Sequence, residues 1–147
     1  MKRAVLAAAL LVLVLAGTGC SRVAAVTQPT QPVTVTFIAH NVDPEVSANL
    51  KVGDALRLKD PGGAIGKIAS LETSKSIQAV PTSQGSIVAT ASPLTDDITI
   101  VVEANGVVDD SGIRVSGVPF FINDSQKLAT SVVQFTGEIV GLKTASK

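Results

Sequence analysis

Two short segments that alternate in polarity constrain the fold of this chain more than any other feature. Residues 33–37 read Val-Thr-Val-Thr-Phe, and residues 98–102 read Ile-Thr-Ile-Val-Val. A period of two places the apolar residues of the first segment on one face of a strand and its threonines on the other. The chain has no Trp, no Tyr and four Phe, so its core must come from aliphatic residues, of which Val and Ile favour strands.

Helix and turn signals separate these segments. Asp43 suits an N-cap, Pro44 the first helical position and Glu45 the positive end of the helix dipole. They predict a helix of at most two turns. Residues 50–58 predict a turn followed by a strand, and residues 60–63 and Asn105-Gly106 predict further turns. Residues 66–71 predict a second strand. The polar, Ser-rich stretch from 73 to 93 contains one more predicted strand, over residues 86–91.

The second half of the chain repeats the first in three blocks that keep their order, with about eight extra residues around positions 123–131 of the second copy. The alternative is that any β-rich sequence of Val, Ile and Gly resembles itself. We favour duplication and predict an all-β fold, a small duplicated barrel or sandwich with one short helix. The matching blocks are 33–37 with 98–102, 50–54 with 113–117 and 66–71 with 137–142, within repeats over 33–72 and 98–143.

The N-terminus carries a short apolar segment that ends at the only cysteine. Lys2 and Arg3 precede an apolar run over residues 4–16, and small residues then lead to Cys20. As a helix, this run would rise only about 20 Å, against a hydrocarbon core of about 30 Å, so it makes a poor permanent span. The pattern resembles the signal of bacterial lipoproteins, in which the cysteine receives a diacylglycerol and the chain is cut before it. We predict residues 1–19 as the signal peptide and Cys20 as the lipid attachment site.

One departure leaves an alternative open. Gly17 stands three residues before Cys20, where leucine is the commonest residue of this motif. The alternative is an ordinary secretory signal cleaved near Ala24 or Ala25, with Cys20 discarded. Lipidation is favoured because a lone thiol cannot form an internal disulfide in an oxidising compartment.

The charge and composition of the chain limit the kinds of partner it can have. Without residues 1–19 the chain has 10 basic and 12 acidic residues, scattered along it, for a net charge of −2. We therefore expect no nucleic-acid partner. Residues 20–32, with Pro29 and Pro32, predict a tether, and residues 33–147 predict one extracytoplasmic domain. The expected location is the cell membrane or the outer membrane, with an envelope protein as a candidate partner.

Three short blocks carry a family resemblance. Leu-Lys-Val-Gly-Asp at 50–54, Ile-Gly-Lys-Ile at 65–68 and Phe-Thr-Gly-Glu-Ile-Val at 135–140 resemble a bacterial family known only as a domain of unknown function, over residues 33–143. The resemblance implies an N-terminal membrane anchor followed by one β-rich extracytoplasmic domain, and it implies no catalytic residues. The glycine hairpin at 62–68 has a fainter likeness to lipid-trafficking domains of the cell envelope.

No group of residues makes a coherent catalytic or cofactor site. His40 is the only histidine, and a strand end exposed to solvent explains it better than catalysis or metal binding. Residues 109–112, Asp-Asp-Ser-Gly, lack the spacing of a calcium loop and fit a turn better, as do Asp96 and Asp97. We predict no enzyme, no metal and no cofactor.

The single aromatic pair is the best candidate for a contact surface. Phe120 and Phe121 are adjacent, so in a strand one would enter the core and the other would face outward. The functional prediction is a membrane-anchored envelope lipoprotein that serves as a non-enzymatic binding, scaffolding or assembly module. The alternative is a component of an envelope export system that handles lipid or polymer.

Overall fold

The computed structural model describes residues 28–144, and this part of the chain is mainly β, as predicted. The predicted signal peptide, Cys20 and most of the tether lie outside the described residues. The elements are β1 (Gln31–Val42), α2 (Pro44–Asn49), β2 (Ala55–Leu58), β3 (Gly63–Pro81), β4 (Ile87–Asp109), β5 (Gly112–Val115), β6 (Val118–Phe120), β7 (Ser125–Ala129) and β8 (Gln134–Thr144).

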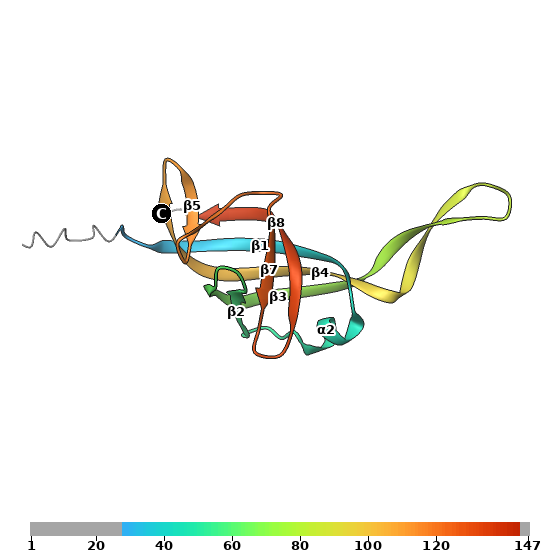
Figure 1. Cartoon of the computed structure of the whole chain (residues 1–147), viewed down its shortest axis with the longest axis horizontal. Coiled ribbons are helices and arrows are strands. Elements are labelled where there is room, and N and C mark those ends of the chain that lie inside the picture. Colours follow the sequence, from blue (N-terminus) through green and yellow to red (C-terminus); the bar gives the residue numbers. More distant parts are fainter. Residues whose placement is uncertain (1–27, 145–147) are drawn as a thin grey trace, which may run out of the picture.

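All strand pairs are antiparallel and belong to one sheet that closes on itself. The order is β1-β8-β7-β2-β3-β4-β5-β6, and a further pairing between β1 and β4 joins six of the strands into a small barrel. β5 turns back alongside residues 106–109 at the end of β4, and β6 pairs with β5, so this hairpin adds two strands to the side of the sheet (Figure 1). Closure leaves no free edge within the six-stranded ring.

The barrel is filled by the apolar face that the alternating segments predict. Val35 and Phe37 of β1, and Ile100 and Val102 of β4, are fully buried. The ring of Phe37 packs edge-on against that of Phe120, with centroids 6.2 Å apart and planes at 76°. The remaining members of this core that are fully buried and large are Leu56, Leu58, Ile68, Ile98, Val115, Leu128 and Ile139.

The strand pairing has the two-fold pattern that a duplicated unit produces. β1 pairs with β4, β2 pairs with β7, β3 flanks β4, and β8 flanks β1, so a two-fold operation exchanges β1-β2-β3 with β4-β7-β8. Blocks 33–37 and 98–102 pair with each other, and blocks 66–71 and 137–142 occupy equivalent flanking strands. The match of residues 50–54 with residues 113–117 is wrong. Residues 50–54 form a loop before β2, whereas residues 113–117 lie in the β5–β6 hairpin, which is inserted before β7.

Asn105-Gly106 is not a turn, contrary to the sequence-based prediction. Both residues lie inside β4, which continues to Asp109. A Cβ on Gly106 would lie 2.9 Å from the carbonyl oxygen of Arg114, so the glycine allows β5 to approach β4 closely. The chain reverses instead after Asp109, where Gly112 has a φ of 118°.

The first strand begins two residues before the predicted start of the domain at Val33. β1 begins at Gln31, so Gln31 and Pro32, which were assigned to the tether, pair with Gly106 and Asn105. The helix α2 is confirmed, and the carboxylate of Asp43 accepts a hydrogen bond from the backbone N–H of Glu45 at 2.8 Å. Within residues 28–144 no helix has the length and apolarity to cross a membrane.

Candidate functional site

A two-stranded arm projects from one end of the barrel. Residues 77–81 of β3 pair with residues 87–91 of β4, well beyond the point where the two strands leave the barrel (Figure 1). Within the described chain no other strand pairs with either segment. The sequence predicted only the strand over 86–91 in this stretch. The term "arm" below means residues 77–91.

The tip of the arm is a tight polar turn. The backbone N–H of Thr82 donates a hydrogen bond to the carbonyl of Ser86 at 2.7 Å, and the hydroxyl groups of the two residues lie 2.7 Å apart. Gly85, with a φ of 79°, donates its N–H to the carbonyl of Thr82 at 3.0 Å. The turn fixes the register of the arm up to its end.

One face of the arm is wholly apolar and exposed. Partners in the ladder point to the same side, and side chains two positions apart share a face. Ile77 is 68% exposed and Ile87 is 74% exposed. Their face consists of the cross-strand pairs Ile77–Ala91, Ala79–Ala89 and Pro81–Ile87, and all six residues are exposed.

The arm also carries no charge. All twenty residues from 76 to 95 lack Asp, Glu, Lys, Arg and His. The second face combines Val80 and Val88 with the polar side chains of Gln78 and Thr90. An isolated two-stranded hairpin is marginally stable in water, so the arm must draw support from its base or from a partner.

Asp97 ties the arm to the end of β1. One of its carboxylate oxygens accepts hydrogen bonds from the hydroxyl of Ser76 at 2.5 Å and from the backbone N–H of Asn41 at 2.9 Å. The other lies 3.0 Å from Nδ1 of His40. The Ser76 hydroxyl, followed by the Asn41 amide, lowers the pKa of Asp97 to about 2.

The neighbouring Asp96 makes hydrogen bonds on the opposite face of the strand, where the arm leaves the barrel. Adjacent strand residues face opposite ways, and Asp96 accepts a hydrogen bond from Nζ of Lys75 and one from the hydroxyl of Ser47 in α2, both at 2.7 Å. The bond from Lys75, then that from Ser47, lowers the pKa of Asp96. Asp96 and Asp97, predicted as turn residues, lie instead in β4 and join β1, α2 and β3 at the base of the arm.

The side chains that meet at the base of the arm, Ser76, Asp96, Asp97 and their hydrogen-bond partners, are called the base cluster below. Their geometry is wrong for nucleophilic catalysis. Ser76 is 1% exposed, and its hydroxyl donates to the carboxylate of Asp97 rather than to an imidazole. A nucleophilic serine needs the histidine between itself and the acid, whereas here the carboxylate lies between serine and His40. An acid with a pKa near 2 stays ionised at neutral pH and is a poor proton donor or acceptor there. The arrangement fits positioning of the arm.

The second acidic pair forms a turn. Asp109 accepts a hydrogen bond from the N–H of Ser111 at 2.8 Å and pairs with the guanidinium of Arg114. Both carboxylate oxygens of Asp109 therefore have protein partners. Among residues 28–144, no group of three or more His, Cys, Asp or Glu is placed to hold a metal ion.

The aromatic pair divides as predicted. Phe120 is buried against Phe37, and Phe121 is 51% exposed. Ile122 is also exposed, which gives this side of the barrel a small apolar spot. This spot is shorter than the apolar face of the arm.

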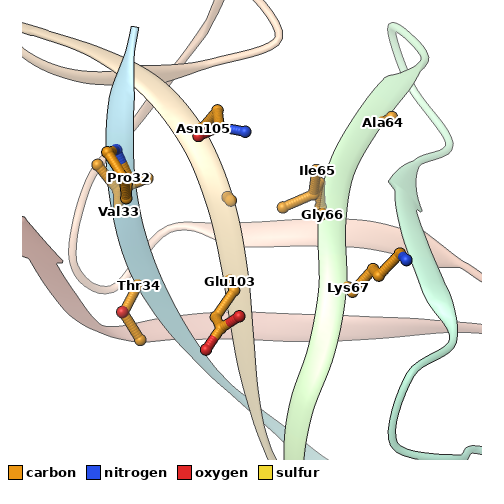
Figure 2. Close-up of a pocket in the computed structure, with 10 residues that line it drawn as sticks. Pro32, Val33, Thr34, Ala64, Ile65, Gly66, Lys67, Glu103 and Asn105 are labelled. Atoms are coloured by element: carbon orange, nitrogen blue, oxygen red, sulfur yellow. The ribbon is translucent and has the colours of Figure 1, made fainter. Parts of the chain in front are cut away.

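A shallow hollow of about 720 Å³ lies at the other end of the barrel. It includes the start of β1 and the adjoining parts of β3 and β4. Figure 2 shows that the side chains of Lys67 and Glu103 point away from each other, so these two charges do not converge on a common ligand.

The sequence carries a signal for the arm that does not depend on alternation of apolar and polar residues. Residues 77–81 read Ile-Gln-Ala-Val-Pro, in which Val80 interrupts the apolar–polar pattern and Pro81 disfavours a central strand. Both are compatible with a strand that has water on both faces. The uncharged run from 76 to 95 is the feature that would have marked the segment.

The sequence matches a known protein family. Over residues 3–143 the sequence matches the family described as Domain of unknown function (DUF4330). The chain belongs to this family. The DUF4330 match confirms the predicted resemblance and extends it to the apolar N-terminal segment, as well as covering the barrel and the arm. No curated protein and no solved structure matches the chain.

Proposed function

We propose that this protein is a non-enzymatic assembly module, held at a membrane surface by a lipid on Cys20, and that the arm is its contact element. The observation that carries the proposal is the apolar, uncharged and exposed face of the arm. A contiguous exposed apolar face on an uncharged projecting segment is a candidate contact surface. A binding function needs no catalytic group, which agrees with the positioning role of the base cluster.

The location of the arm supports this function. β1 runs from Gln31, which pairs with Gly106, to Val42, which pairs with Asp96 at the base of the arm. The start of the domain and the arm therefore lie at opposite ends of the barrel (Figure 1). If the chain before β1 is anchored in a membrane, the arm points away from that membrane, toward other proteins.

The barrel gives less support to the handling of lipid or polymer. Its interior is occupied by side chains such as Phe37, Leu56 and Ile100, which are fully buried. A lipid chain would have to bind outside the barrel. The polar tip of the arm, at Thr82 and Ser86, is also a poor element for insertion into a bilayer.

Site-specific photocrosslinking in membranes tests the contact role. A photoreactive amino acid is placed at Ile87 on the apolar face of the arm, in the full chain, and cells are irradiated. The matched control is Val132, an exposed apolar residue of the β7–β8 loop on the barrel. We expect protein adducts at Ile87 and at least tenfold fewer at Val132. Equal yields at the two positions, or none at Ile87, would contradict the proposal.

Fatty-acid labelling tests the anchor separately. The full chain and a Cys20→Ser variant are expressed with a labelled fatty acid, and both are fractionated. We expect label and membrane association to be lost together in Cys20→Ser. Equal labelling of the two chains would remove the lipid anchor from the proposal and leave the contact role of the arm to the crosslinking result.

A further inference from the structure

We infer that the partner of the arm is a second copy of this chain, and that two arms pack together through their apolar faces about a two-fold axis. The inference deepens the proposed function, on which it rests. Two observations carry it: the arrangement of large and small side chains on the face, and the absence of charge. The size of the face sets the strength of the pairing.

The large and small side chains are arranged so that the face complements itself. Ile77 lies on β3 at the base of the arm and Ile87 lies on β4 toward its tip, so the two isoleucines occupy diagonal corners. Small residues or Pro81 fill the other positions. A two-fold axis in the plane of the face, running along the arm, moves each isoleucine to the other diagonal and keeps both barrels at the same end of the paired arms. Each isoleucine of one copy then meets Ala91 or Pro81 of the other.

This complementarity between two copies of the face follows from the strand register of the arm alone. Under this axis the central pair, Ala79 and Ala89, meets only alanines of the second copy. Two faces of this kind can approach closely, because no bulky residue opposes another at the corners or at the centre. A partner of different sequence would need to supply the same complementary pattern, whereas a second copy has it already.

The lack of charge removes the usual obstacle to self-association. A surface that meets its own copy brings like charges together, which costs free energy. The arm avoids this cost, since the nearest charged residues in the chain are Lys75 and Asp96, and these pair with each other at the base.

The size of the face predicts a weak pairing. Each face is about 10 Å wide and about 17 Å long, which is far smaller than the roughly 800 Å² per partner of a standard stable interface. We therefore expect dimers where the chain is concentrated, as on a membrane surface, and monomers on dilution.

Charge exchange on the apolar face tests the inference. Two differently tagged copies of the full chain, each with the photoreactive residue at Ile87, are expressed together, and adducts that carry both tags are measured in membranes. Ala89→Lys in both copies, or Ala89→Glu in both, places like charges in the interface, and we expect at least a tenfold loss of the mixed adduct. Ala89→Lys in one copy with Ala89→Glu in the other should restore at least half of the unsubstituted yield.

The matched control lies on the next residue. Thr90 is exposed on the opposite face of the same strand, so Thr90→Lys and Thr90→Glu add the same charges away from the proposed interface. We expect these variants to keep the mixed adduct at its original yield. An equal loss at positions 89 and 90 would overturn the inference, because it would show that the charge acts without regard to the face.

The outcomes separate this inference from the proposed function. Adducts at Ile87 with another protein, and none with a second copy, would overturn the dimer and leave the assembly module standing. Failure of the Lys–Glu combination to restore the mixed adduct would likewise overturn pairing of copies. The absence of any adduct at Ile87 would overturn both.

Discussion

The arm is built from β3 and β4, two strands that also form part of the barrel, and the two regions of these strands differ in what covers them. In β4, Ile98, Ile100 and Val102 are fully buried, whereas Ile87 of the same strand is 74% exposed. In β3, Ile68 is buried and Ile77 is exposed. The apolar side chains of the barrel are explained by the core. Within residues 28–144 those of the arm have no such cover, and this difference is the basis of the proposed contact.

The transition between the two regions is abrupt. Lys75 pairs with Asp96, and the next pair in the ladder is Ile77 with Ala91. One residue of β3 and four of β4 are therefore left out of the ladder at the base. Bulges of this kind redirect a strand pair, and the hydrogen bonds of Asp96 and Asp97 fix the new direction.

The largest effect is expected from a core substitution in the barrel. Phe37→Ala removes a fully buried ring that packs against Phe120, and we expect a loss of about 3–5 kcal/mol in the free energy of unfolding. The measurement is urea unfolding of the full chain in mild detergent, followed by circular dichroism, because the chain has no Trp. The control, Phe121→Ala, removes a half-exposed ring and should cost about 1 kcal/mol or less. Equal losses would mean that Phe121 is also a core residue.

The comparison also explains what the sequence could reveal. The barrel was predictable because one face of each strand is buried, so its residues alternate, as Val33, Val35 and Phe37 do. The short helix was predictable from the local cap at Asp43. Closure of the sheet was harder to predict, because the β1–β4 and β2–β7 pairings join segments that lie far apart in the chain.

The candidate site was less predictable for a physical reason. A strand with water on both faces has no burial pattern to leave in its sequence, and the run from 77 to 81 therefore looks like a loop. The role of Asp97 depends on Asn41 and Ser76, which come from two other strands. Only the folded chain brings these groups together.

An intermediate effect is expected at the base of the arm. The hydrogen bonds from Ser76 and Asn41 lower the pKa of Asp97 to about 2. A lowered pKa in the folded state means that Asp97 contributes stability above its ordinary pKa of 3.8, and that this contribution is lost as the pH falls toward 2. We expect Asp97→Asn to cost about 1 kcal/mol at pH 7, since the carboxylate is 28% exposed.

The pH dependence separates this role from a general effect of charge. The difference in unfolding free energy between the original chain and Asp97→Asn should shrink as the pH falls from 4 to 2. The control is Asp110→Asn at the exposed turn after β4, which we expect to change the unfolding free energy at pH 7 by no more than about 0.5 kcal/mol. A difference for Asp97→Asn that persists at pH 2 would contradict the proposed role of its ionised form.

The smallest effect is expected on the arm, and it should depend on concentration. Ile87→Ala removes an exposed side chain, and in dilute solution we expect a change of no more than about 0.5 kcal/mol in unfolding free energy. Ile100→Ala, the same substitution in the buried part of β4, should cost about 2–5 kcal/mol. If two arms pair, the original chain gains stability as it is concentrated, because binding stabilises the folded state by mass action, and Ile87→Ala gains less. A cost above 1 kcal/mol in dilute solution would mean that the arm already packs against its own barrel.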